Sequence, residues 1–124
     1  MSVESIEFKK FYRNNITNMS WMFFKCSFLK EINLSNFNTN NVTDMESMFR
    51  GCSSLKEINL NKFNFKKIIK MYSMFEGCQT LEEINISDFN VHEYADMEYM
   101  FKGCLDNLKH KIGDKFKNIK ENVL

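Results

Sequence analysis

Hydrophobic and polar residues follow two different patterns within residues 42–67. Ile58 and Leu60 occupy alternate positions of the stretch LKEINLNKF, between polar residues, which predicts a short strand with one buried face. Met45, Met48 and Phe49 lie three and four residues apart, the spacing of one face of a short helix. We therefore expect one strand and one short helix in this stretch.

The whole pattern repeats every 26 residues. Four columns of the chain keep the same residue type in all four copies: Met19, Met45, Met71 and Met97; Met22, Met48, Met74 and Met100; Phe23, Phe49, Phe75 and Phe101; Cys26, Cys52, Cys78 and Cys104. One strand and one short helix cannot bury their own apolar faces, so successive copies must stack against one another. The methionine and phenylalanine columns are predicted to form the core of that stack.

The repeat frame predicts a single domain, 1–124. It consists of a half repeat at 4–15, full repeats at 16–41, 42–67 and 68–93, and a degenerate repeat with a C-terminal cap at 94–124. A stacked aromatic column is expected from Phe11, Phe37, Phe63 and Phe89.

Local signals predict where the short helices begin and end. Thr43 and Glu46 have the spacing of a capping box. Gly51, Gly77 and Gly103 are expected to adopt the left-handed conformation that ends a helix.

After Cys104 the repeat pattern is lost, and apolar residues recur at spacings of three and four from Leu105 to Val123. This pattern indicates an amphipathic helix. Three interpretations remain open: a helix that caps the stack, a degenerate strand followed by a tail, and a basic helix that binds a membrane surface or a partner.

The segment LSNFNTNNVTDMESMFRGCSSL, residues 34–55, resembles the BspA-like leucine-rich repeats that also occur in mycoplasma lipoprotein-associated domains. The resemblance implies an α/β repeat fold, a short right-handed leucine-rich-repeat solenoid with parallel strands on one face and short helices on the other. It also implies a secreted or surface-attached protein that functions in adhesion. The stretch MSVESIEFKKFYRNN has neither a basic start nor an apolar region, so no signal peptide is expected and the chain as written is cytoplasmic.

Charge and composition narrow the classes of function. With 17 basic and 16 acidic residues, the chain lacks the broad positive field that non-specific nucleic-acid binding requires. No apolar run approaches the roughly 20 residues that span a bilayer. His92 and His110 have no repeated partner, and no catalytic arrangement stands out. We expect a monomeric, non-enzymatic protein without cofactor or metal.

The evenly spaced cysteines have three interpretations. They are buried small side chains, disulfide partners in adjacent copies, or metal ligands, although single cysteines 26 residues apart lack the close pairs typical of zinc sites. We expect Cys26, Cys52 and Cys78 to be buried and Cys104, near the irregular end, to be more accessible.

The outward side of the predicted strands is the candidate binding site. Its residues are Glu31, Asn33, Ser35, Glu57, Asn59, Asn61, Glu83, Asn85 and Ser87. Asparagine is a poor strand former, so its recurrence indicates either an amide ladder between strands or contact with a ligand. Like charges on adjacent strands are mildly destabilising, so the glutamate column indicates either a binding function or simple repeat duplication.

These features favour a protein-binding or glycan-binding module of the adhesion type. Two alternatives remain: a thiol or metal protein that uses the cysteine column, and an architectural segment of a larger surface protein.

Overall fold

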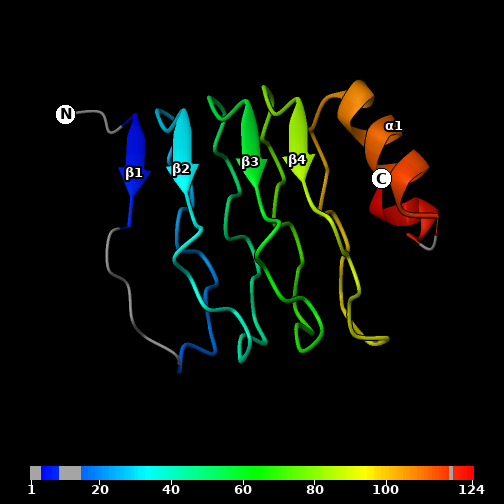
Figure 1. Cartoon of the computed structure of the whole chain (residues 1–124). Helices are drawn as coiled ribbons and strands as arrows, with labels where there is room; N and C mark the ends of the chain where they lie inside the picture. Colours follow the sequence, from blue (N-terminus) through cyan, green and yellow to red (C-terminus); the bar gives the residue numbers. More distant parts are fainter. Residues whose placement is uncertain (1–3, 9–14, 118) are drawn as a thin grey trace.

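The computed structural model describes residues 4–8, 15–117 and 119–124. Its regular elements are β1 (Ser5–Glu7), β2 (Glu31–Asn33), β3 (Glu57–Asn59), β4 (Glu83–Asn85), α1 (Asp106–Lys115) and the 3-10 helix η1 (Glu121–Val123). The strands lie side by side in chain order, and α1 lies at the end of the row next to β4 (Figure 1).

The strands form two small parallel sheets. β1 pairs with β2, and β3 pairs with β4. The register joins residues 26 positions apart, such as Ile6 with Ile32 and Ile58 with Ile84, while β2 packs beside β3. A small α/β structure with short parallel strands is thereby confirmed.

Alternation along the strands matches the sequence prediction. Ile58 and Leu60 are each only 1% exposed, whereas Glu57, Asn59 and Asn61 are exposed. The strands span only three residues in each copy, and each of β2, β3 and β4 ends at an asparagine.

The short helices predicted around the methionines do not form, and that prediction is wrong. Residues 46–51 form consecutive turns. Alternate N–H groups donate to carbonyl groups of the next copy: Met45 to Lys70 at 2.8 Å, Ser47 to Tyr72 at 2.9 Å, Phe49 to Met74 at 2.9 Å and Gly51 to Glu76 at 2.8 Å. In an α-helix, the same N–H groups would donate to carbonyl groups of their own segment. The chain uses them instead to join successive copies.

This arrangement requires left-handed residues inside each turn segment. Ser47 has φ 53° and Gly51 has φ 79°. The prediction for the glycines is confirmed, since Gly77 and Gly103 both have φ 78°. Lys25 adopts the same conformation at φ 56°, although a side chain there costs roughly 1–2 kcal/mol.

The predicted capping box is also absent. The N–H of Glu46 donates to Oδ1 of Asp44 at 2.9 Å, and the hydroxyl of Thr43 donates to the carbonyl of Thr17 at 3.3 Å. Thr43 therefore links two copies instead of capping its own segment.

Stacked phenylalanines run through the core. The ring of Phe49 lies 5.5 Å from Phe23 and 5.5 Å from Phe75, and Phe75 lies 5.9 Å from Phe101. The interplanar angles are 14°, 3° and 6°. Every copy thus contributes one ring to a continuous apolar column.

The second aromatic column is less regular than predicted. Phe11 lies outside the described residues. Phe8 contacts Phe37 at 4.7 Å, and Phe65 contacts both Phe63 and Phe89, at 5.9 and 5.1 Å. Additional rings therefore contribute to this column beside the predicted ones.

The C-terminal helix is shorter than the apolar spacing predicted. α1 buries Leu108 and Ile112 against the core and ends at Phe116, which has φ −119° and ψ 85°. The ring of Phe116 packs on Phe89 at 5.4 Å. Among the described residues, no helix has the length and apolarity needed to cross a membrane.

Candidate functional site

The candidate binding residues lie together on one side of the strand row, here called the strand face. Its residues are Glu31, Asn33, Ser35, Glu57, Asn59, Asn61, Glu83, Asn85 and Ser87. Eight of them are exposed and Asn85 is half-buried. Parallel register places Glu57 beside Glu83 and Asn59 beside Asn85, as a 26-residue repeat requires.

The strand face is hollowed along the row. A depression of about 500 Å³ is lined by Glu31, Asn33, Glu57, Asn59 and Asn85, together with β1. Ser35 and Asn61 line a neighbouring depression, whereas Glu83 and Ser87 line neither of the two. The depressions therefore bring together seven of the nine candidate residues.

The asparagines have a local role that neither sequence interpretation included. Oδ1 of Asn33 accepts hydrogen bonds from the N–H and the hydroxyl of Ser35, at 3.0 and 2.7 Å. Oδ1 of Asn59 accepts the N–H of Asn61 at 2.9 Å. These are Asx turns, and they account for the asparagines at the ends of β2 and β3. The amide oxygen is used within the turn, which leaves the amide N–H groups as donors on the strand face.

The same turn recurs outside the strands. Asn18, Asn38, Asp44, Asn64 and Asp96 each accept the N–H of the residue two positions later. A recurring Asn or Asp before each change of direction was the signal available in the sequence.

The glutamate row is exposed and carries no ion pair within the described part of the chain. The pairs found there are Lys30–Glu4 at 3.5 Å, Arg50–Glu76 at 3.4 Å and Lys117–Asp114 at 3.8 Å. A further depression, of about 700 Å³, is lined by the three glutamates together with Lys30, Lys56 and Lys111. The row thus presents unpaired carboxylates to solvent.

The cysteines are free, and three of them donate Sγ–H to a carbonyl of the preceding copy. The acceptors are Phe23 for Cys52 at 3.2 Å, Phe49 for Cys78 at 3.1 Å and Phe75 for Cys104 at 3.2 Å. No group of three or more metal-ligating side chains occurs in the described ranges.

Cys52 and Cys78 are buried as predicted, but the predictions for Cys26 and Cys104 are wrong. Cys104 is only 8% exposed because α1 begins two residues later and packs over this end. Cys26 is half-buried, since it belongs to the first copy and has no earlier turn segment over it among the described residues.

Thiol labelling should follow this pattern of burial. Burial raises the pKa of Cys52 to about 12 and that of Cys104 to about 11, and it raises the pKa of Cys78 further. Since the thiolate is the reactive form, we expect Cys26 to react first at pH 8. The other three should react at least about a hundredfold more slowly, because each pKa unit lowers the thiolate fraction tenfold. Peptide-resolved mass spectrometry measures each rate, with urea-unfolded protein as the control. Rapid native labelling at all four positions would contradict the buried arrangement.

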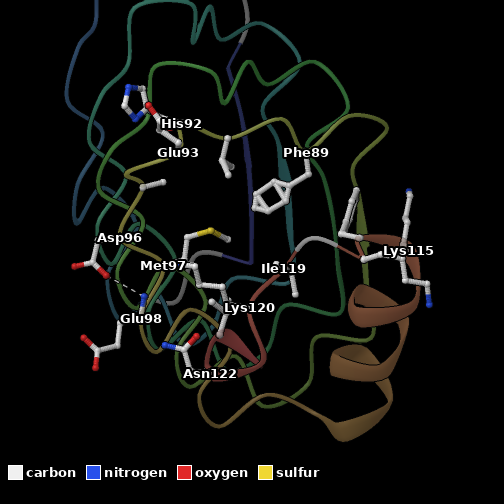
Figure 2. A pocket seen from close by; sticks show the side chains of 15 residues that line it. Phe89, His92, Glu93, Asp96, Met97, Glu98, Lys115, Ile119, Lys120 and Asn122 are labelled. Carbon is white, nitrogen blue, oxygen red and sulfur yellow. Dashed lines mark hydrogen bonds between the residues drawn. The ribbon is translucent and has the colours of Figure 1, made fainter.

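A separate cavity of about 640 Å³ lies at the C-terminal end of the row and is here called the end cavity (Figure 2). Its lining comes from two stretches of the chain, residues 89, 91–93 and 95–98 and residues 115–117, 119–120 and 122–123. None of the three interpretations of the C-terminal stretch included this cavity.

Comparison with known proteins identifies a family. No curated protein and no solved structure matches the chain significantly. The family model described as "Mycoplasma protein of unknown function, DUF285" matches residues 2–115. The match extends across all four strands and through α1. The chain therefore belongs to the DUF285 family.

Proposed function

We propose that the chain is a non-enzymatic binding module that presents the strand face to a protein or glycan partner. The observation that carries this proposal is the row of Glu31, Glu57 and Glu83, which are exposed and without ion pairs in the described structure. Unpaired like charges on adjacent strands add nothing to folding. Their recurrence is therefore better accounted for by a partner.

The architecture we propose is a right-handed solenoid of the BspA-like leucine-rich-repeat type, with turn segments in place of short helices. Parallel strands at a 26-residue offset support it. So do the backbone hydrogen bonds that join each turn segment to the next copy. The resemblance extends this proposal to adhesion at a cell surface.

Partner chemistry follows from the groups that the strand face offers. Carboxylates accept hydrogen bonds, and the amides of Asn33 and Asn59 retain their N–H donors, because only Oδ1 is used in the Asx turns. Extended protein segments rich in lysine or amides, and the hydroxyl groups of glycans, match this set. Several equivalent contacts in a row give useful avidity from modest individual affinities.

The alternatives receive less support. A thiol or metal function requires accessible thiolates, whereas Cys52, Cys78 and Cys104 are buried and have raised pKa values. A purely architectural segment would not require the exposed acidic row.

Replacing Glu31, Glu57 and Glu83 together with glutamine tests the strand face. We expect the free energy of unfolding to stay within about 0.5 kcal/mol of the parent, because exposed charges are well screened. Capture of a partner found on matrix-protein and glycan arrays should weaken and lose salt dependence, since rim charges chiefly control association rate and specificity.

The matched control removes three acidic charges elsewhere, through Glu46→Gln, Asp106→Asn and Asp114→Asn. Capture should persist in this variant. If the control variant lost partner capture and the variant without the three glutamates kept it, the binding site would lie away from the strand face.

A further inference from the structure

The end cavity has an apolar interior that remains partly open. Phe89, Met97 and Ile119 are half-buried and pack against the core, and Val123 is buried. Figure 2 shows Phe89, Met97 and Ile119 around the middle of the cavity. The volume of about 640 Å³ is within the range of roughly 300–1,000 Å³ typical of small-molecule sites.

Acidic and basic side chains both line the cavity. Among the lining residues, the acidic side chains of Glu93, Asp96 and Glu98 and the basic side chains of Lys115, Lys117 and Lys120 are all exposed. In Figure 2 the carboxylates of Asp96 and Glu98 lie at one rim, and Lys115 lies on the opposite side.

The two sets of charges do not neutralise each other within the described structure. Lys117 pairs with Asp114 at 3.8 Å, and the ammonium of Lys115 lies 5.5 Å from the centre of the Phe116 ring. Lys115 and Glu98 have no ion-pair partner among the described residues. Phe89, Met97 and Ile119 lie between these two side chains in Figure 2, so a ligand that spans the cavity can meet an acidic group at one end and a basic group at the other.

We propose that the end cavity binds a short apolar peptide with free ends. Its ammonium group faces Asp96 and Glu98, its carboxylate faces Lys115, and its side chains contact Met97 and Ile119. An extended tripeptide spans about 10 Å, which suits a cavity of this size. An anionic amphiphile such as a fatty acid fits less well, because its chain would lie against the acidic side without compensating those charges.

Trileucine with free ends is the probe. Methyl NMR of the protein labelled at methionine should show a saturable shift at Met97, with the methyl groups of Met45 and Met71 unchanged, because these two are fully buried in other copies. Calorimetry gives the dissociation constant. Acetylating the N-terminus or amidating the C-terminus of the probe should each weaken binding about two- to fivefold, the range expected for partly exposed charge contacts.

Two variants assign the ends of the peptide. Glu98→Gln should weaken the free peptide two- to fivefold yet leave the acetylated peptide unaffected, because that contact is already absent. Lys115→Gln should weaken the free peptide two- to fivefold and leave the amidated peptide unaffected. Lys62→Gln, which changes an exposed lysine outside the cavity, is the control and should bind like the parent.

Three outcomes would overturn the proposal: no shift at Met97, equal binding of free and blocked peptides, or tighter binding of decanoate than of trileucine. These three outcomes do not test the strand face. That face is tested by the substitutions at Glu31, Glu57 and Glu83, which lie outside the end cavity. Failure of one proposal is therefore distinguishable from failure of the other.

Discussion

Replacing Phe75 with alanine is expected to lower the free energy of unfolding by about 3–5 kcal/mol. The side chain is completely buried, and its ring stacks between Phe49 and Phe101 at 5.5 and 5.9 Å. Removal leaves a cavity in the middle of the apolar column and also removes two aromatic contacts. A domain of this size is stable by roughly 5–15 kcal/mol, so the loss is a large fraction of the total. Thermal unfolding should show a decrease in Tm of roughly 10–20 °C.

The chain offers matched controls for this substitution. Phe28→Ala removes the same atoms from a side chain that is 63% exposed, and stability should change by less than about 0.5 kcal/mol. Phe23→Ala should have an intermediate effect, because Phe23 stacks on Phe49 alone and meets Phe8 only edge-on, at 6.0 Å. Equal losses at Phe75 and Phe28 would show that the column does not determine stability.

Strand positions were predictable because their signal is local and strong. Ile58 and Leu60 alternate with polar residues, and a period of two matches only an extended chain with one buried face. The repeat then determines register, since equivalent residues of identical copies pair most simply with one another. Glu57 accordingly lies beside Glu83.

Turn segments were not predictable from the same reasoning. Met45, Met48 and Phe49 have helical spacing, but a chain of turns brings the same residues to one side. The deciding interaction is a hydrogen bond to another copy, such as Phe49 to Met74 at 2.9 Å. The spacing of apolar residues within a single copy does not predict a hydrogen bond to another copy. The left-handed conformation of Ser47 and Ser73 was not predictable either, because among residue types only glycine is a strong sequence signal for that conformation.

The strand face was only partly predictable. Exposure of Glu31, Glu57 and Glu83 follows from strand alternation, and the structure places them as expected. The Asx turns of Asn33 and Asn59 were not predicted, because the amide ladder looked across the strands and ligand contact looked outward, whereas each side chain accepts a hydrogen bond from the residue two positions later. The end cavity depends on how residues after Lys115 leave the helix, which the apolar spacing does not encode.

Deleting residues 105–124 is expected to produce concentration-dependent oligomers, whereas we expect the intact protein to be a monomer. α1 and the segment after it contribute Leu108, Ile112 and Val123 to the core. Their loss uncovers the Phe101 ring and the free edge of β4, which are apolar and unpaired surfaces that promote association. Size-exclusion chromatography with light scattering measures the change.

The free ends of the row indicate a head-to-tail geometry for this association. Four N–H groups in the last turn segment have no acceptor among the described residues, at Met97, Tyr99, Phe101 and Gly103. Four carbonyl groups in the first turn segment accept no hydrogen bond there, at Asn18, Ser20, Met22 and Phe24. The two sets have the spacing that joins neighbouring copies within the chain.

In the intact protein, α1 lies beside β4 (Figure 1) and occupies the place where β1 of a second molecule would continue the row. The truncated chain lacks this obstacle. Because a head-to-tail contact does not close on itself, it produces a series of oligomers instead of one symmetric dimer. Adding Met22→Lys to the truncated chain should suppress the series, since Met22 is 41% exposed at the accepting edge. The intact chain carrying Met22→Lys should remain monomeric and melt like the parent. A truncated protein that is monomeric with unchanged Tm would show that residues 105–124 do not cap the row, and a single stable dimer would exclude the head-to-tail geometry.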